Sequence, residues 1–435
     1  MTALGPVRQA PALWLGLSGG ADSMALLHAL AAVRTHLPPL RAIHIHHGLH
    51  PDADRWAAWC AHVCAALDIP LQIERVTLSA SGNIEQQARD ARYTVFTRYL
   101  AAGDVMLLAH HRDDQLETLA LRLLRGTGLR GLAGMPQRRA LGRGELFRPL
   151  LDYGHSDLLQ WLRSQNLDWI EDPANRDARF ARSWLRHHAL PALSQQWPQA
   201  QVSLLRVAEH AAEANQLLDE LAAEDQHAAQ CRSDDPWLQA VPALVLTVVQ
   251  QLSPARQRNL LRYWLQQQGC RLPDQRHLLA LQAQCAAAHD RQPHWQLADA
   301  RVQVALGRLW LLSENGLPAG KAELLPDQPV LSLAAGNGLL RQRSSSGCLP
   351  WAGDWQVQYR QGGEQLRLPG RPRKALKALL QEAGIPAWLR PGLPLIYCDG
   401  QLVSVAGRWH SAEHAARIAE QGWWLDWQPF TVRQA

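Results

Sequence analysis

The stretch that most constrains the fold is an apolar run that ends in a Ser-Gly-Gly turn and continues as a helical pattern. The run is Leu13–Leu17, the turn is Ser18–Gly20, and apolar residues then recur at helical spacing through Ala21–Val33. This order predicts a buried strand, a tight turn and a helix whose first turn carries Asp22 and Ser23. N–H groups at such a turn suit a phosphate, and glycines let it come close. We therefore favour a phosphate site over a plain strand-to-helix connection with a serine cap.

Strand and helix patterns alternate along the rest of the first third of the chain. The expected strands are Leu40–His46, Leu71–Val76, Val105–His110 and Phe147–Leu151. The expected helices are Asp54–Leu67, Asn83–Leu100, Asp113–Leu124, Ser156–Gln165 and Ala181–Leu190, the last one stopped by Pro191. This order predicts an α/β fold with a Rossmann-like parallel sheet covered on both faces, and ligands at the carboxyl ends of its strands.

The remainder of the chain predicts smaller units. Val202–Asp225 has the pattern of a long amphipathic helix, and Asp399-Gly400 between two alternating runs is a hairpin signal. A basic helix is expected at Arg373–Ala383. The expected parts are a catalytic α/β domain at 1–195, a helical spacer at 196–225, a mainly helical middle domain at 226–314, a Gly-, Pro- and Ser-rich linker at 315–350 and a small α+β domain at 351–435.

Composition narrows the class of protein. The chain is 47% hydrophobic and 19% charged, which is typical of a globular protein. No stretch approaches the roughly 20 apolar residues that span a membrane, and Met1–Ala12 lacks the pattern of a secretory signal. We therefore expect a cytoplasmic protein without a membrane partner. The net charge of +5 permits a nucleic-acid partner without demanding one.

The seven cysteines are scattered, and no C-x-x-C motif occurs. Buried or incidental free thiols explain them best. Their arrangement argues against a zinc or iron–sulfur site built from cysteines.

The histidine-rich segment His44–His50 allows two hypotheses. Four of its seven residues are histidines, which suits a metal site. However, His44 and His46 share one face of the expected strand, and no cysteine or acidic set of suitable spacing accompanies them. The rim of a nucleotide pocket is therefore the better interpretation.

A second polar block, His110–Thr118, follows a buried strand and opens a helix. Asp113 and Glu117 are four residues apart and share a helix face, and Asp114 lies beside them. Carboxylates at a helix start also interact favourably with the helix dipole. Two histidines and three carboxylates at the carboxyl end of a strand nevertheless favour a Mg²⁺ and acid–base site.

Arginines mark two further segments. In Arg122–Gly134 they flank four glycines, which indicates either a flexible connection or a loop that closes over substrate phosphates. Arg182 and Arg186 are one helical turn apart. That spacing suits a solvated helix face and a nucleic-acid contact equally.

Several of these motifs together resemble one enzyme family. The turn Ser18–Ser23 is similar to the SGGxDS signature of the PP-loop ATP pyrophosphatases, which cleave ATP between its α- and β-phosphates and adenylate a substrate oxygen. The blocks that narrow the resemblance to the tRNA(Ile)-lysidine synthetase family are His47–Leu49, Gly82–Glu85, Ala88–Tyr93, His110–Thr118, Leu123–Met135 and Glu171–Pro173. The tail resembles the longer form of that family through Gly362–Glu364, Gly384–Arg390 and Pro394–Ile396, whereas the middle segment matches more weakly.

The resemblance implies a two-step reaction with ATP and Mg²⁺ as cofactors. In the first step, ATP adenylates the C2 oxygen of the wobble cytidine, C34, of a tRNA(Ile) with a CAU anticodon, and pyrophosphate leaves. In the second step, the ε-amine of free L-lysine attacks C2 and displaces AMP. The product is lysidine, and the tRNA then reads AUA as Ile.

The resemblance also implies roles for individual residues. The residues implied to bind the cofactor are Ser18, Gly19, Gly20, Ala21, Asp22, Ser23, His44 and His110. Those implied to bind Mg²⁺ are Asp22 and Asp113. Catalysis falls to Asp22, Asp113, Asp114, Glu117, Arg122 and Arg125. Substrate contact falls to Glu85, Arg89, Arg92, Gly128, Arg130, Arg182, Arg186, Arg373 and Lys374. The lysine amine must lose a proton before it attacks, and the four carboxylates of the catalytic set are equal candidates for its base.

The same motifs allow two other interpretations. The first is another enzyme of the PP-loop class. Thiolating tRNA enzymes commonly use catalytic or cluster-binding cysteines, and the absence of a C-x-x-C motif argues against them. GMP or NAD synthetases would lack the arginine–glycine segment and the basic tail that this chain has. A non-catalytic tRNA-binding module with a decayed nucleotide site is the alternative from another class. The intact Ser18–Ser23 turn and Asp113-Asp114 pair argue against decay.

The expected C-terminal domain is rich in basic residues. A solvated helix face would explain them, but a tRNA substrate favours phosphate contacts. The residues are Arg367, Arg371, Arg373, Lys374 and Lys377. The sequence is also compatible with a homodimer.

Overall fold

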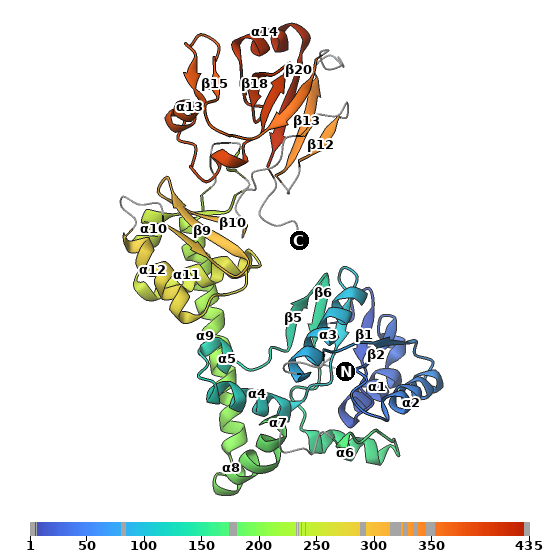
Figure 1. The fold of residues 1–435 in the computed structure, drawn as a ribbon. Coiled ribbons are helices and arrows are strands. Elements are labelled where there is room, and N and C mark those ends of the chain that lie inside the picture. The colour runs from blue at the N-terminus through green and yellow to red at the C-terminus, as the bar shows by residue number, and fades with distance from the viewer. Residues whose placement is uncertain are drawn as a thin grey trace. The chain divides into compact units, whose positions relative to one another are not determined.

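The structure is a computed structural model that describes residues 5, 7–79, 84–173, 181–231, 233, 235, 237–239, 241–287, 293–313, 323–324, 329–333, 337–344 and 353–429. The chain divides into two compact units, Met1–Leu217 and Leu218–Ala435, and each is described by itself (Figure 1). In these ranges no helix is both long enough and apolar enough to cross a membrane.

The first unit is built on a six-stranded sheet with the order β3-β2-β1-β4-β6-β5. Its strands are β1 (Leu13–Gly16), β2 (Leu40–His46), β3 (Leu71–Arg75), β4 (Val105–Leu107), β5 (Arg138–Leu141) and β6 (Gly144–Phe147). All neighbours are parallel except β5, which runs antiparallel to β6. The predicted Rossmann-like α/β sheet is therefore confirmed. The last strand ends at Phe147 rather than beginning there, and Pro149 could not donate a hydrogen bond to a longer ladder.

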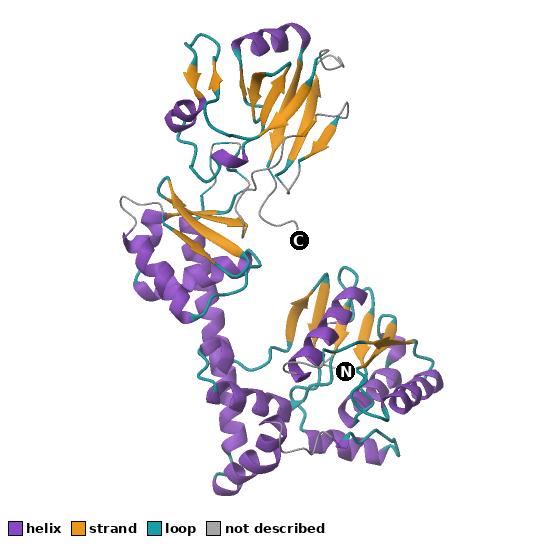
Figure 2. Cartoon of the chain, in the orientation of Figure 1, coloured by secondary structure: helices purple, strands orange, loops and turns teal. Residues whose placement is uncertain are grey.

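Helices cover both faces of this sheet (Figure 2), because side chains along its strands alternate between two cores. Leu13 and Leu15 pack with α1, α2 and α6, whereas Trp14 between them packs with α3. The helices are α1 (Ala21–Ala32), α2 (Ala53–Ala66), α3 (Ile84–Tyr99), α4 (Arg112–Leu124), α5 (Leu129–Leu132), α6 (His155–Ser164), α7 (Ala181–Trp184), a π-helical turn (Leu185–Ala189), α8 (Leu190–Gln196) and a 3-10 turn (Arg34–His36). Pro191 does not stop a helix. It lies in the first turn of α8, where its missing N–H has no helical partner to lose.

The middle of the chain combines helices with a small antiparallel sheet. The long helix α9 (Ala200–Ala229) contains the predicted spacer helix and crosses the boundary between the two units. After it come β7 (Ala243–Val245), α10 (Leu246–Gln251), α11 (Pro254–Gln267), α12 (Gln275–Ala287), β8 (His294–Gln296), β9 (Ala300–Ala305) and β10 (Arg308–Ser313). The sheet has the order β7-β10-β9-β8 and shares one core with the three helices, which includes the buried Trp264.

The C-terminal part is rich in strands. Its elements are β11 (Glu323–Leu324), β12 (Val330–Ser332), β13 (Leu339–Ser344), β14 (Trp355–Gln358), β15 (Gln365–Leu366), β16 (Lys374–Ala375), α13 (Leu376–Glu382), a 3-10 turn (Arg390–Gly392), β17 (Leu395–Cys398), β18 (Gln401–Val405), β19 (Trp409–His410), α14 (Ala412–Gln421) and β20 (Trp423–Gln428). The predicted hairpin is confirmed. Asp399 (φ 50°) and Gly400 (φ 75°) both adopt the left-handed conformation of a tight turn between β17 and β18.

Two expectations for this part are wrong. The segment 315–350 is not a plain linker, because β11, β12 and β13 lie within it and β13 pairs along its whole length with β20. Glycines and serines surround its apolar residues, so the sequence shows no clear strand pattern there. The strand that pairs with β13 lies about 80 residues further along the chain. The basic helix is also shorter than expected, since Lys374–Ala375 form a strand and the helix begins at Leu376.

Candidate active site

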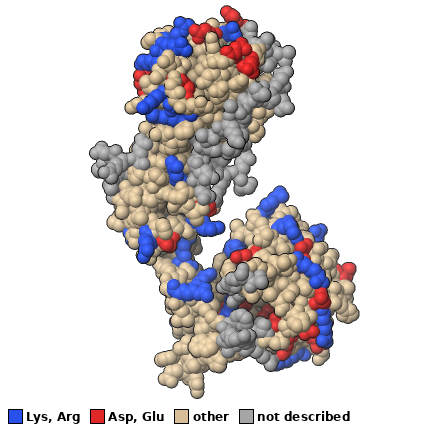
Figure 3. All heavy atoms as spheres, in the orientation of Figure 1, with Lys and Arg blue, Asp and Glu red and all other residues tan. Residues whose placement is uncertain are grey.

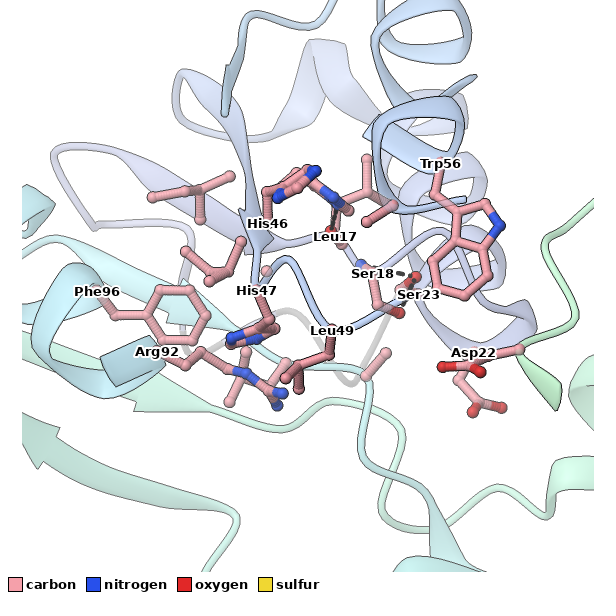
Figure 4. Close-up of a pocket in the computed structure, with 18 of the residues that line it drawn as sticks. Leu17, Ser18, Asp22, Ser23, His46, His47, Leu49, Trp56, Arg92 and Phe96 are labelled. Atoms are coloured by element: carbon pink, nitrogen blue, oxygen red, sulfur yellow. Dashed lines mark hydrogen bonds between the residues drawn. The ribbon is translucent and has the colours of Figure 1, made fainter. Parts of the chain in front are cut away.

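A cavity of about 450 Å³ lies at the carboxyl ends of β1, β2 and β4 (Figure 4). This volume is in the range of small-molecule and cofactor sites. Residues of the histidine-rich segment His44–His50 and of the polar block His110–Thr118 line it, together with Ser18, Asp22 and Ser23 at the glycine turn. Trp56 and Asp22 lie on one side of it, and Phe96, Arg92 and His47 lie on the other (Figure 4). The further lining residues include His44, His46, His50, His110, Asp114 and Asp172.

The glycine turn is organised around the hydroxyl of Ser23, whose side chain is buried. Its Oγ accepts the N–H of Ser18 at 3.2 Å and the N–H of Gly19 at 3.1 Å. These two donors are therefore already satisfied within the turn. The N-terminus of α1 is different. Its N-cap residue is Gly20, which has no side chain that could accept a hydrogen bond from the first turn of the helix. The first turn of α1 therefore offers the donors for a phosphate.

Only a glycine fits at position 19, because of the backbone conformation there and because of the neighbouring side chains. Its φ is 88°, and a Cβ there would lie 2.5 Å from Cδ1 of Ile170 and 3.0 Å from Sγ of Cys60. The N–H of Ile170 also donates to the carbonyl of Gly19 at 2.9 Å. Burial raises the pKa of Cys60 to about 12, so this thiol serves as apolar packing. The segment after α6 thus holds the turn in place.

Asp22 joins the turn to two histidines. Its carboxylate accepts a hydrogen bond from Nδ1 of His155 at 2.8 Å, and Nε2 of His111 lies 3.5 Å away. Burial alone would raise the pKa of Asp22, but the hydrogen bonds and charges of His111 and His155 hold it well below its usual value. Asp22 is therefore anionic throughout the neutral range.

His111 determines what kind of metal this site can hold. The donor atoms of Asp22, His111 and His155 all lie within 4.8 Å of one another. However, Nδ1 of His111 accepts the N–H of Asp113 at 3.2 Å, which leaves the proton on Nε2. That nitrogen faces Asp22 and Asp114, each at 3.5 Å, and cannot bind a metal while protonated. The residues therefore fit Mg²⁺ through carboxylate oxygens, which it prefers, and not a metal that needs both imidazoles.

The two neighbouring aspartates have different surroundings. Asp113 accepts the N–H of His155 at 2.7 Å at the start of α6 and does not line the cavity. Asp114 accepts the N–H of His111 at 3.1 Å and does line it. Of the two, Asp114 is the one that shares the cavity and the Nε2 nitrogen of His111 with Asp22.

Glu117 is fully buried and held by two arginines. Its carboxylate oxygens lie 3.1 Å from Nε of Arg182 and 2.5 Å from Nε of Arg186. The side chains of Arg182 and Arg186 are 33% and 36% exposed, so the solvated-face interpretation is wrong for both. Arg186 also lies 3.6 Å from Asp114, which links this network to the cavity.

The arginine–glycine segment is held from within. Nη1 of Arg122 donates to the carbonyls of Gly131 at 3.0 Å and Gly134 at 2.6 Å. Arg122 of α4 therefore holds α5 and the turn that follows it. Arg125 and Gly128 are exposed, and neither they nor Arg130 line the cavity.

Among the other predicted residues, Arg92 and His110 line the cavity. Nδ1 of His44 donates to the carbonyl of Leu17 at 2.9 Å, which ties the ends of β1 and β2 together at the cavity. Arg373 and Lys374 belong to the second unit, where Nζ of Lys374 lies 2.8 Å from Glu382. The side chain of Glu85 lies outside the described part of the chain.

Sequence reasoning assigned no role to three residues of this site, although Asp172 lies in the Glu171–Pro173 motif. His155 contacts Asp22 although 133 residues separate them in the chain. Trp56 and Asp172 line the cavity from α2 and from the segment after α6. Only the position of His155 at the start of a helix that follows the last strand could have drawn attention to it.

Comparison with known proteins agrees with this geometry. The PP-loop domain family matches residues 2–193, the TilS substrate binding domain matches residues 244–310, and the TilS substrate C-terminal domain matches residues 355–427. The fold and the site thus define a PP-loop enzyme, a class that uses ATP.

Similar proteins narrow the class further. A tRNA(Ile)-lysidine synthase of Pseudomonas putida is 47% identical over 93% of this chain and 94% of its own length. Those of Pseudomonas aeruginosa and Escherichia coli O157:H7 are 44% and 37% identical, over 99% and 95% of this chain and 96% of each relative. The chain belongs to the tRNA(Ile)-lysidine synthase family of tRNA-modifying ligases, as the sequence motifs predicted.

Proposed function

We propose that the chain uses ATP to join free L-lysine to C2 of C34 in a tRNA(Ile) with a CAU anticodon. The reaction passes through an adenylated tRNA, releases pyrophosphate and then AMP, and lets the tRNA read AUA as Ile. It takes place in the cytoplasm. The first domain holds ATP, and the middle and C-terminal parts contact the tRNA.

One observation carries this proposal. The start of α1 and the carboxylates of Asp22 and Asp114 meet in a single cavity at the carboxyl ends of parallel strands. An uncapped helix start suits the phosphates of ATP, and carboxylates suit the cation that accompanies them. The cavity thus combines what pyrophosphate release requires in a chain of this family.

Mg²⁺ would be held by Asp22 and Asp114 in the adenylation step. Bound there, it would neutralise charge on the departing pyrophosphate. Asp22 is kept anionic by its two histidines and keeps its position through the 2.8 Å hydrogen bond from His155. His155 is therefore a positioning residue for Asp22.

The surroundings of the four carboxylates favour Asp114 as the base for the lysine amine. Glu117 is buried between Arg182 and Arg186, and Asp113 accepts the backbone N–H of His155. Asp22 is held by two histidines. Asp114 lines the cavity and contacts one histidine rather than two, so it can accept the proton of the amine in the second step, after its proposed role toward Mg²⁺ in the first.

The test is incubation of the full chain with α-labelled ATP, free lysine and tRNA(Ile) transcripts that carry C34 or U34. We expect AMP release that requires both lysine and C34. Pyrophosphate release from the C34 transcript without lysine would report the adenylation step separately. AMP release that is independent of lysine, or equal with U34, would refute the proposal.

A further inference from the structure

Arginines gather around Tyr93 beside the cavity. The guanidinium carbons of Arg89 and Arg139 lie 5.0 and 4.9 Å from the centre of the Tyr93 ring. Nε of Arg148 donates to Nδ1 of His110 at 3.2 Å. We name as the arginine cluster the residues Arg89 and Arg92 of α3, Arg122 of α4, Arg139 of β5 and Arg148 after β6.

The cluster has no counter-charge in the described part of the chain. No carboxylate there lies within 4.0 Å of any of its guanidinium groups. Burial lowers the pKa of Arg92, Arg122 and Arg148, and the charge of Arg89 lowers each of them further. Arg148 is only 2% exposed. Because a buried charge without a partner is costly, such a cluster indicates an anionic ligand.

The cluster adjoins the cavity at two residues. Arg92 and His110 both line it, and Arg92 lies across the cavity from Asp22 (Figure 4). Burial, together with the charge of Arg148, holds the pKa of His110 at about 4, so the ring is neutral at pH 7. Since its Nδ1 accepts from Arg148, its Nε2 carries the proton and is a hydrogen-bond donor.

We propose that the arginine cluster binds a backbone phosphodiester of the RNA substrate, across the cavity from the helix start that takes the phosphates of ATP. This inference rests on the proposed function, which supplies the RNA. Guanidinium groups bind phosphate oxygens through paired hydrogen bonds. A phosphate of ATP would offer the same chemistry. A polynucleotide fits better, because only Arg92 of the five lines the cavity, and a ligand that reaches Arg89 and Arg139 must extend beyond it.

The test compares two adjacent arginines on the same strand. Arg139→Gln removes a charge from the cluster, whereas Arg138→Gln removes one that already pairs with Glu145. The binding affinity of each variant is measured by two equilibrium titrations. One uses a tRNA(Ile) transcript with a CAU anticodon at several salt concentrations, and the other uses ATP. We expect Arg139→Gln to weaken RNA binding roughly three- to tenfold and to reduce the salt slope by about 0.7–0.9.

We expect ATP affinity to stay within about twofold in both variants, and RNA affinity to stay unchanged in Arg138→Gln. The proposal is overturned if Arg139→Gln weakens ATP binding as much as RNA binding, if it weakens ATP binding alone, or if it behaves like Arg138→Gln. Neither titration contains lysine. A chain that binds RNA through the cluster but makes no lysidine would therefore contradict the proposed function alone.

Discussion

The two groups of arginines beside the cavity differ in what they contact. Arg182 and Arg186 hold the buried carboxylate of Glu117 and approach Asp114. The arginine cluster meets an aromatic ring, a histidine and backbone carbonyls. Arg182 and Arg186 therefore fix the position of carboxylates beside the cavity, whereas the arginine cluster has no carboxylate partner among the described residues. Basic residues lie among acidic ones on the visible face of both units (Figure 3).

The largest expected effect is on the carboxylate side of the cavity. Asp22→Asn removes the charge at the start of α1 and weakens the contacts with His111 and His155. We expect AMP release to fall about 10²–10³-fold, as for loss of one preorganised electrostatic group. Asp113→Asn is the matched variant. Its AMP release should fall less than about tenfold, because Asp113 does not line the cavity. Equal losses in the two variants would remove the distinction between these aspartates.

The next effect is on stability and tests the paired arginines. Glu117→Gln leaves Arg182 and Arg186 without their buried carboxylate, and we expect the free energy of unfolding to fall by about 2–3 kcal/mol. Glu145→Gln breaks the more exposed pair with Arg138 and should change it by less than about 1 kcal/mol. Urea unfolding followed by circular dichroism measures both. A loss for Glu117→Gln no larger than that for Glu145→Gln would show that the buried pair contributes little.

A pH effect tests the arginine side. The pKa of His110 is lowered to about 4, so the unfolded chain binds its proton near pH 6.5 while the folded chain does not. Stability should therefore fall as the pH drops from about 6.5 to 4, by on the order of 1–3 kcal/mol from this residue. His110→Gln should flatten this dependence, and substitution of the exposed His36 by Gln should not. The same slope in both variants would mean that His110 is not held neutral.

The smallest effect extends the comparison to the second unit. Lys374 pairs with Glu382, whereas Arg373 is exposed and makes no ion pair within the described ranges. We expect Arg373→Ala to raise the tRNA KM two- to threefold, by about 0.5 kcal/mol, and Lys374→Ala to raise it less. Steady-state kinetics at varied tRNA concentration measures both. A larger effect from Lys374→Ala would show that pairing does not decide which cations reach the RNA.

Local patterns predicted the parallel sheet, the strand–turn–helix unit around Ser18–Gly20 and the hairpin at Asp399-Gly400, because each depends on residues close together in the chain. They did not predict the β13–β20 pairing, whose partners run from Ser344 with Trp423 to Leu339 with Gln428 and are thus 79 to 89 positions apart. They also did not predict the contact between His155 and Asp22, which are 133 positions apart. The same limit left Arg182 and Arg186 undecided. Their partner, Glu117, is 69 residues before Arg186, and only the fold brings the charges together.

The most direct test of the central claim is the identity of the nucleoside at position 34 after reaction. A tRNA(Ile) transcript with a CAU anticodon is incubated with the full chain, ATP, Mg²⁺ and lysine, digested to nucleosides and analysed by mass spectrometry. We expect a cytidine derivative heavier than cytidine by one lysine less one water, and none when lysine or ATP is left out. Unmodified cytidine at position 34, in a reaction where the RNA is bound and ATP is consumed, would contradict the account.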